Sequence, residues 1–368
     1  MYKKAALVVV MLVFHLISPH QVWAEEIQCN GKAGIVMDVE TGRILYEKNI
    51  FEELPMASTT KIMTALLAIE NIPLDKKVEI HPKAQGVEGS SIYLEANEKV
   101  RMIDLLYGLM LRSGNDAAEA IAYEVSGSIE EFAVLMTARA RELGANNTSF
   151  MNPHGLHDDN HYTTAYDLAV ITREALKNPT FKQIVKTKFW VAEREGYKHF
   201  TNKNKTLNIC EGGDGVKTGF TKKAGRCLVA SATKNNMQFI AITLNDGDWF
   251  NTTKQLLEYS FEKYQPYKLV EKGDIIKQIM VENGTKDYLY VRAPRTIIIP
   301  VIEGEEEKII SVIQTPTLLD APIINGQVIG KMLTYLNGEL IDTQSLLANE
   351  NIDKLTIKER VLKFLKIY

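Results

Sequence analysis

A serine and a lysine three positions apart, Ser58 and Lys61, are the pair in this sequence best suited to covalent catalysis. A serine hydroxyl is a weak nucleophile near neutral pH and needs a neighbouring base. Side chains at positions i and i+3 of a helix share one face, so a neutral Lys61 amine could take the proton of the Ser58 hydroxyl. Because a free lysine has a pKa of about 10.4, burial or a nearby positive charge has to stabilise the neutral amine.

Two further motifs could complete such a site. In Ser113-Gly114-Asn115, the serine hydroxyl could relay a proton and the asparagine amide could hold a peptide carbonyl. In Lys217-Thr218-Gly219, the ammonium could keep Lys61 neutral, and Gly219 would let a substrate approach the backbone closely. Each motif by itself is more often a helix start or a loop. The three together, in this order in an exported chain, predict one catalytic site.

The pattern around these motifs predicts a sheet with helices packed on it. Strand-like runs near residues 34–46 form a hairpin, a helical stripe follows Ser58, and residues 103–181 are mostly helical. Three later apolar runs predict antiparallel strands, and a helix closes the segment: 215–221, 227–232, 239–244 and 252–264. The expected fold class is α+β, with helices on the faces of an antiparallel sheet and a helical insertion.

A second, smaller domain is expected after this one. The composition changes near Gln265-Pro266, and residues 267–350 contain short strand-like runs between turn residues, without a long helical stripe. The domains are therefore expected at 25–265 and, β-sandwich-like, at 267–350. Residues 353–368, which include five basic residues, are expected to form an amphipathic helix. This helix could lie on an anionic membrane surface as an anchor or dock on the second domain.

The first 24 residues are typical of a cleavable secretory signal. Lys3 and Lys4 precede an apolar run from Ala5 to Ile17, and Val22 and Ala24 supply small residues before the expected cleavage point. This run is shorter than the roughly 20 apolar residues that a membrane span needs. The protein is therefore expected to be extracytoplasmic. Cleavage would change the formal net charge from −3 to −5, and this acidic balance suggests no nucleic-acid partner.

The three cysteines, Cys29, Cys210 and Cys227, are too few and too widely spaced for a disulfide framework or a zinc motif. For Cys210 and Cys227 the sequence leaves two alternatives. They could form one disulfide, or both could be small buried thiols without a bridge.

Three histidines at positions 154, 157 and 161, with acidic residues between them, could suggest a metal site. The adjacent Asn, Pro and Gly residues favour a solvated loop instead. The reaction expected of Ser58 requires neither a metal nor another cofactor.

Taken together, the motifs resemble those of penicillin-binding proteins and class A β-lactamases, with their SxxK, SxN and KTG elements. The chain is more similar to the D-alanyl-D-alanine carboxypeptidases, the serine DD-peptidases of low molecular mass. Four segments carry this similarity: 55–65, 112–118, 152–156 and 214–219. The resemblance runs from about Gly34 to Phe261, and more loosely through 321–322 and 326–330. It implies a β-lactamase-like peptidase domain.

The resemblance also implies the reaction and its partners. Ser58 would attack the carbonyl between the two terminal D-alanines of a peptidoglycan stem pentapeptide, Lys61 would accept its proton, and Ser113 would help to pass that proton to the leaving amine. Lys217 and Thr218 would bind the terminal carboxylate and Asn115 the substrate backbone. The amides of Ser58 and Phe220 would form the oxyanion hole. β-Lactams would acylate Ser58 as substrate mimics, and the pathway would be cell wall biogenesis.

The sequence departs from the family pattern at two places. Phe220 stands where some members have histidine, which matters little if only its backbone amide is used. The segment 245–251 lacks the arginine that several members place near the substrate carboxylate. Its Asn-Asp-Trp character resembles the sporulation-associated branch.

Three alternatives remain open at the level of sequence. A β-lactamase would use the same nucleophile, but the second domain and the lack of an evident deacylating glutamate count against it. A non-catalytic module that binds peptidoglycan or senses β-lactams is disfavoured because Ser58, Lys61, Ser113 and Lys217 are all present. Transpeptidation would need an acceptor site that the sequence does not reveal.

Overall fold

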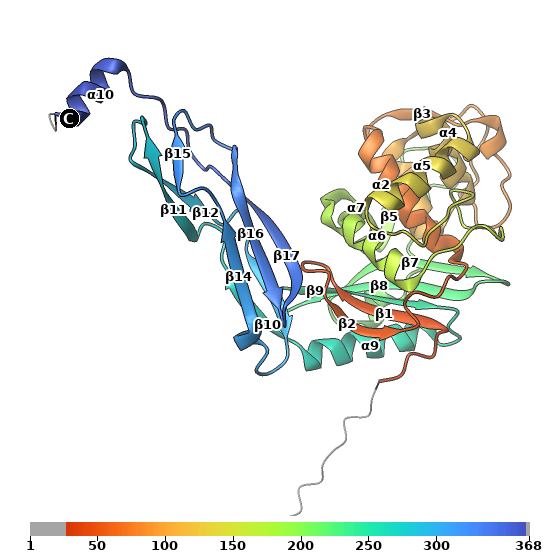
Figure 1. Ribbon diagram of the computed structural model, residues 1–368. Helices are drawn as coiled ribbons and strands as arrows, with labels where there is room; N and C mark the ends of the chain where they lie inside the picture. Colours follow the sequence, from red (N-terminus) through yellow and green to blue (C-terminus); the bar gives the residue numbers. More distant parts are fainter. Residues whose placement is uncertain (1–26, 366–368) are drawn as a thin grey trace, which may run out of the picture.

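The computed structural model describes residues 27–365, so the expected signal at 1–24 lies outside the described residues. Figure 1 shows an α+β domain joined to an elongated β-rich domain that leans away from it and ends in the helix α10. The inner side of this bend lies between α6 and α7 of the first domain and β17 of the second.

The first domain is built on a five-stranded antiparallel sheet with the order β2-β1-β9-β8-β7. Its strands are β1 (Ala33–Asp38), β2 (Ile44–Lys48), β7 (Gly213–Thr221), β8 (Gly225–Lys234) and β9 (Met237–Leu244). The hairpin and the three later strands that the sequence predicted are confirmed. Because β7 is an edge strand, one of its sides is free to face a substrate.

Side chains that point alternately to the two faces of the sheet explain why helices cover both faces. In β1, Ile35 and Met37 join the core beneath the helical region, whereas Val36 joins the core beneath α9 (Trp249–Lys263). Successive side chains of a strand point to opposite faces, so a strand that is apolar at every position needs cover on both. Leu256 and Leu257 of α9 supply that cover on one face.

A helical region covers the other face and holds most of the motifs. Three of its α-helices have side-chain caps, from Ser128, Thr164 and Asn178. Its helical elements are η1 (Ala57–Thr60), α2 (Lys61–Asn71), η2 (Pro82–Ala84), α3 (Met102–Tyr107), the π-helix η3 (Gly108–Arg112), α4 (Asn115–Ser126), α5 (Ile129–Glu142), α6 (Ala165–Lys177), α7 (Pro179–Lys186) and α8 (Thr206–Ile209). Two short hairpins lie between them: β3 (Lys77–Glu79) with β4 (Lys99–Arg101), and β5 (Phe189–Val191) with β6 (His199–Thr201).

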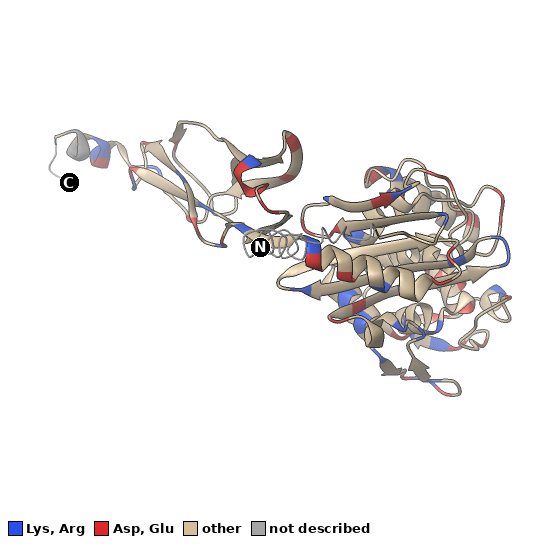
Figure 2. Cartoon of the chain, turned by 90° about the horizontal axis from the view of Figure 1, so that it is seen from below, with Lys and Arg blue, Asp and Glu red and all other residues tan. Residues whose placement is uncertain are grey.

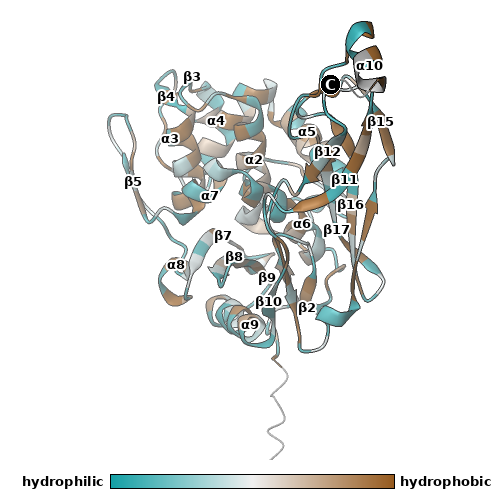
Figure 3. Ribbon diagram, turned by 90° about the vertical axis from the view of Figure 1, so that its left-hand side faces the viewer, coloured by the Kyte–Doolittle hydropathy of each residue, from teal (hydrophilic) through white to brown (hydrophobic). Residues whose placement is uncertain are grey.

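The second domain consists of three small sheets around a separate core. Leu289 and Val291 of β12 point into this core while Tyr288 and Tyr290 are exposed, which is the period-two pattern of a half-buried strand. Apart from the 3-10 turn η4 (Glu306–Lys308), its elements are the strands β10 (Gln265–Val270), β11 (Ile275–Glu282), β12 (Tyr288–Arg292), β13 (Ile297–Val301), β14 (Ile309–Gln314), β15 (Leu318–Asp320), β16 (Val328–Leu336) and β17 (Glu339–Leu347). Figure 3 shows apolar stretches in both domains, along α3 and β16 among others.

Two arginines connect the domains. Arg43, just before β2, donates to the Pro300 carbonyl and pairs with Glu305 at 2.7 Å, both in the second domain. Arg295 of the second domain pairs with Glu40 in the β1–β2 turn. These contacts hold the second domain against the far edge of the sheet from β7.

The end of the described chain is the short helix α10 (Ile357–Phe364). Ile357, Val361 and Leu365 are 75%, 53% and 56% exposed, so this apolar side is not docked on the second domain. Figure 2 places α10 at the end of the molecule farthest from the first domain, with Lys, Arg, Asp and Glu interspersed over both domains. The described part of the chain contains no helix long and apolar enough to cross a bilayer.

The three cysteines are buried free thiols. Of the two alternatives for Cys210 and Cys227, the unbridged one is therefore found. Burial raises the pKa of each of these two thiols to about 11.

Candidate active site

Ser58 lies in the tight 3-10 turn η1, immediately before α2, rather than in the first turn of one continuous helix. Because residues i and i+3 eclipse in a 3-10 turn, the Ser58 and Lys61 side chains still meet, with Oγ and Nζ 3.0 Å apart. Ala57 precedes the serine with a φ of +49°, a left-handed conformation that is unusual for alanine. A Cβ on Gly155 would collide with the Ala57 carbonyl, so glycine is required there to hold this turn.

The surroundings of Lys61 fit a neutral amine. Its Nζ lies 2.7 Å from the Asn115 Oδ1 and 2.7 Å from the His154 carbonyl oxygen, two groups that can only accept hydrogen bonds. A neutral amine has two N–H bonds and one lone pair. Donation to these two acceptors leaves the lone pair for the remaining neighbour, the Ser58 hydroxyl. The geometry therefore suits removal of the serine proton by Lys61.

Burial is the main factor that favours the neutral form of Lys61. The side chain is fully buried, and this burial lowers its pKa well below the ordinary lysine value. The charge of Lys217 lowers it further, and Lys203 adds to this, whereas Asp116 acts in the opposite direction. The second lysine that the sequence suggested thus lies close enough to Lys61 to influence its pKa.

Lys217 reaches the site from the edge strand β7. Its side chain is 2% exposed and donates to the Thr218 carbonyl at 2.7 Å. Burial, assisted by Lys203, lowers its pKa to about 7. Thr218 is half-buried, and Phe220 is 61% exposed at the end of the strand.

Gly219 has a packing role that the sequence analysis did not predict. A Cβ at this position would lie 2.9 Å from the Ser58 nitrogen and 3.1 Å from the Met56 oxygen. Such contacts are too close, so glycine is needed for β7 to pack directly against η1. This packing brings the backbone of β7 beside the nucleophile.

The second motif stands where η3 meets α4. Ser113 is buried in the left-handed conformation with φ of +65°, and the hydrogen bonds found among the described residues do not involve its hydroxyl. Asn115 bridges the site: its oxygen faces Lys61 and its amide nitrogen donates to the Glu88 carbonyl. The substrate-binding group predicted from the sequence thus already holds the loop at residue 88 in place.

The histidine loop is more buried than its composition suggested, since His154 and His161 are only 6% and 3% exposed. Each accepts a backbone N–H at Nδ1, so each neutral ring has its proton on Nε2. Nε2 of His161 lies 2.8 Å from the Thr60 hydroxyl, and that of His154 lies 3.4 Å from Glu119. The described residues contain no cluster suited to a metal ion. These two histidines hold the loop beneath η1 instead.

Sequence reasoning missed three contributors to the site. The His154 carbonyl belongs to the backbone, so the residue type gives no signal. Lys203 lies outside every motif. Asp116 follows the second motif directly, and its carboxylate accepts from Ser91 Oγ and from the Ile92 and Leu94 amides, which fixes the loop over the site. Its position next to Asn115 was the one available signal.

Arg226 at the start of β8 lies beside the segment that lacks the expected arginine. Its guanidinium donates to the Gly247 carbonyl at 2.8 Å, and it stands opposite Phe220 in the β7–β8 pair. A guanidinium is therefore present next to segment 245–251, although it comes from another strand.

The chain was compared with known proteins. Residues 20–248 match the family described as D-alanyl-D-alanine carboxypeptidase, and residues 264–354 match the penicillin-binding protein 5 C-terminal domain. D-alanyl-D-alanine carboxypeptidase DacF of Bacillus subtilis is 34% identical over 89% of this chain and 87% of its own. Penicillin-binding protein 5 of Haemophilus influenzae superposes with a TM-score of 0.70 at 30% identity, over 89% of this chain and 98% of that one. A Streptococcus pneumoniae structure described as PBP3 gives 0.74 at 25% identity, over 89% and 100%.

Proposed function

The chain belongs to the D-alanyl-D-alanine carboxypeptidase family, and we propose that Ser58 is the nucleophile and Lys61 the base of its reaction. The protein is a serine-type carboxypeptidase that removes the terminal D-alanine from peptidoglycan stem peptides and binds penicillins. The observation that carries the assignment of residues is the buried amine of Lys61, held between two acceptors with its third neighbour at Ser58.

In the first step Lys61 takes the Ser58 proton, and Oγ bonds to the carbonyl carbon between the two D-alanines. The C–N bond then breaks, and the proton passes to the leaving amine with help from Ser113. In the second step water attacks the acyl-enzyme, Lys61 again takes a proton, and Ser58 recovers its hydroxyl. No metal or other cofactor takes part.

Substrate recognition is assigned to the β7 side. Lys217 and Thr218 bind the terminal carboxylate, and Asn115 binds the peptide backbone. The amides of Ser58 and Phe220 stabilise the oxyanion. The close packing of Gly219 on Ser58 supports this pairing, because it brings the two stretches of backbone together. Loss of one oxyanion donor typically reduces turnover about 10²- to 10³-fold.

Mass spectrometry after exposure to benzylpenicillin tests the nucleophile. We expect one adduct on the parent protein and none on Ser58→Ala, with D-alanine release from a stem-peptide mimic lost in the variant. The variant lacks only the Ser58 hydroxyl, and circular dichroism checks that it folds like the parent. An adduct that remains on Ser58→Ala would exclude Ser58, and rapid release of hydrolysed penicillin would indicate a β-lactamase.

We also propose that the enzyme is exported by its first 24 residues and contacts the membrane through α10. Its relatives act on peptidoglycan, outside the cytoplasm. The exposed apolar residues of α10, together with Lys358 and Arg360 on the same short helix, support a surface helix on anionic lipid.

A further inference from the structure

We propose that a groove between the two domains binds a short peptide that carries a free carboxylate. Two adjoining hollows of about 570 and 690 Å³ form this groove. They share Val39, Glu40, Leu176 and Lys182, so they are continuous. A volume of a few hundred Å³ is usual for a small-ligand site. The inference rests on the proposed function, because a stem peptide that has lost its terminal D-alanine belongs to this class of peptide.

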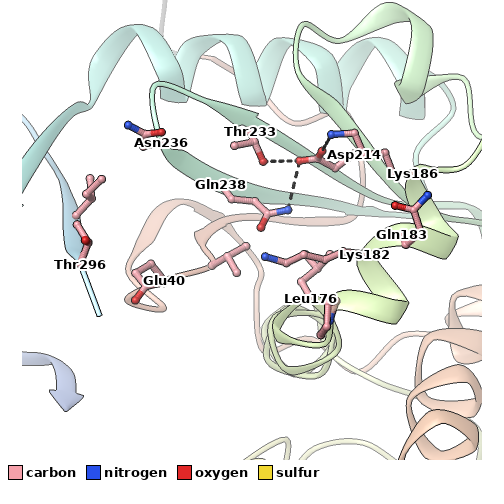
Figure 4. A pocket seen from close by; sticks show the side chains of 13 residues that line it. Glu40, Leu176, Lys182, Gln183, Lys186, Asp214, Thr233, Asn236, Gln238 and Thr296 are labelled. Atoms are coloured by element: carbon pink, nitrogen blue, oxygen red, sulfur yellow. Dashed lines mark hydrogen bonds and ion pairs between the residues drawn. The ribbon is translucent and has the colours of Figure 1, made fainter. Parts of the chain in front are cut away.

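Both domains contribute to the groove, which we call the interdomain groove. The first domain supplies α7, the end of α6 and the β1–β2 and β8–β9 turns, and the second supplies Thr296, Ile298 and residues 340–343. Figure 4 shows the first hollow from close by, with the Lys182 side chain extending into it below Gln238. None of Ser58, Lys61 and Lys217 lines it. A ligand could therefore occupy the groove while Ser58 is acylated.

The charges of the interdomain groove favour an anion. Five basic and three acidic side chains line it: Arg173, Lys177, Lys182, Lys186 and Arg295, against Glu40, Asp214 and Asp342. All three carboxylates are already paired, Glu40 and Asp342 with Arg295, and Asp214 with Lys186 at 3.1 Å.

Two of the cations have no carboxylate partner among the described residues. The Lys182 side chain makes no ion pair or hydrogen bond there, and the Arg173 guanidinium donates only to the carbonyls of Val39 and Glu40, each at 2.7 Å. A ligand carboxylate would supply the missing counter-charge at Lys182, where a charge-assisted hydrogen bond is stronger than a neutral one.

The rest of the lining suits a peptide rather than an inorganic anion. The exposed amides of Gln183 and Asn236 make no side-chain hydrogen bond among the described residues, so they can pair with peptide groups. Pro179 and Ile298, which are at least partly exposed, offer apolar surface for aliphatic side chains. Such a site would let the enzyme hold a trimmed stem peptide while Ser58 acts on a neighbouring one.

The test is a calorimetric titration of the full mature chain with the tetrapeptide L-Ala-γ-D-Glu-L-Lys-D-Ala. Benzylpenicillin first blocks Ser58, so that binding reports a second site. We expect saturable binding that Lys182→Glu weakens at least about tenfold, because a charge-assisted contact is replaced by a repulsion. The matched control is Lys254→Glu on α9, on the opposite face of the sheet, which should bind like the parent. Amidation of the peptide carboxylates should weaken binding as much as Lys182→Glu does.

A peptide that fails to bind the acylated protein, or binds Lys182→Glu as tightly as the parent, overturns the inference. A measurement of D-alanine release by the parent distinguishes failure of the groove inference from failure of the proposed function. If release is normal and groove binding is absent, only the groove is wrong. If the parent neither releases D-alanine nor reacts with penicillin, the proposed function fails. Peptide binding is then compared between Ser58→Ala with and without Lys182→Glu, and the effect of Lys182→Glu alone decides whether the groove binds the peptide.

Discussion

A fully buried lysine is normally expensive, because the interior disfavours its charge and its long side chain loses conformational freedom. In the reaction proposed for Ser58 this cost would serve the chemistry, since the burial that destabilises the ammonium lowers the pKa of Lys61 and favours a basic amine. Asn115 and the His154 carbonyl orient the amine without neutralising a positive charge. A carboxylate in either position would favour the ammonium and remove the base.

The pH dependence of turnover should report both lysines. If Lys61 is the base, activity requires its neutral form, so kcat/KM should rise as the pH increases through its lowered pKa. If Lys217 binds the substrate carboxylate, activity also requires its charged form, and burial lowers the pKa of Lys217 to about 7, so this charge is lost as the pH increases through that value. We expect a bell-shaped profile of kcat/KM for a carboxylate-terminated peptide, measured from pH 5 to 10.

Lys217→Arg supplies the control, because arginine keeps its charge over this whole range. Its alkaline limb should move to higher pH even if its maximal rate is reduced. An alkaline limb at the same pH in both proteins would show that another group is responsible.

Among the elements, the loop at residues 151–161 connects stability to the site. Burial lowers the pKa of His161 to about 4, below the ordinary value of 6.5. Between these pH values the unfolded chain binds more protons at this position than the folded chain. The free energy of unfolding that His161 contributes is therefore lost as the pH falls from about 6.5 to about 4, by an amount on the order of 3 kcal/mol.

Replacement of His161 by glutamine should reduce this loss. We expect the difference in unfolding free energy between pH 7 and pH 4.5 to be smaller in His161→Gln than in the parent. Urea unfolding followed by tryptophan fluorescence measures it, since Trp190 and Trp249 both lie in the first domain. His157→Gln on the same loop is the control, because His157 is exposed. Equal pH dependence in all three proteins would disprove the assignment.

The same elements show what sequence alone could predict. The strands around β7 were predictable because their apolar runs are bounded by turn residues, and the pairing of Ser58 with Lys61 because spacing alone places them together. The 3-10 turn at Ser58 was not, since it depends on tertiary packing against Gly155 and β7. The π-helix before Ser113 was not either, since it packs against α2, α7 and β6, which lie elsewhere in the sequence. The histidine loop was expected to be solvated because polar composition does not reveal that a ring will hydrogen-bond beneath another element.

At the scale of the molecule, the junction between the domains depends on Arg43. Its guanidinium pairs with Glu305, and the two side chains are only 14% and 10% exposed. Arg43→Ala leaves Glu305 without this partner in a mostly buried place, so we expect a loss of about 1.5–3 kcal/mol. Differential scanning calorimetry should show a lower melting temperature. The double variant Arg43→Ala/Glu305→Gln should recover part of the lost stability, because it removes the unpaired charge of Glu305.

The control for this junction is Lys32→Ala. Lys32 pairs with Glu52, but these side chains are 51% and 36% exposed. An exposed pair is worth at most about 1 kcal/mol. If Lys32→Ala and Arg43→Ala lower the melting temperature equally, the junction is not held by Arg43 in the way proposed.

The second domain separates α10 from the active site, so the helix can meet a lipid surface while Ser58 remains at a distance from it. If α10 binds anionic lipid, each basic residue near the surface contributes about 1 kcal/mol. Lys358→Glu/Arg360→Glu should therefore weaken cosedimentation with phosphatidylglycerol-containing vesicles at least about tenfold. Lys222→Glu/Lys223→Glu, which makes the same charge change in the exposed β7–β8 turn of the first domain, should sediment like the parent. Parent protein that binds neutral and anionic vesicles equally, or an α10 variant that sediments as the parent does, would exclude an electrostatic contact between α10 and the membrane.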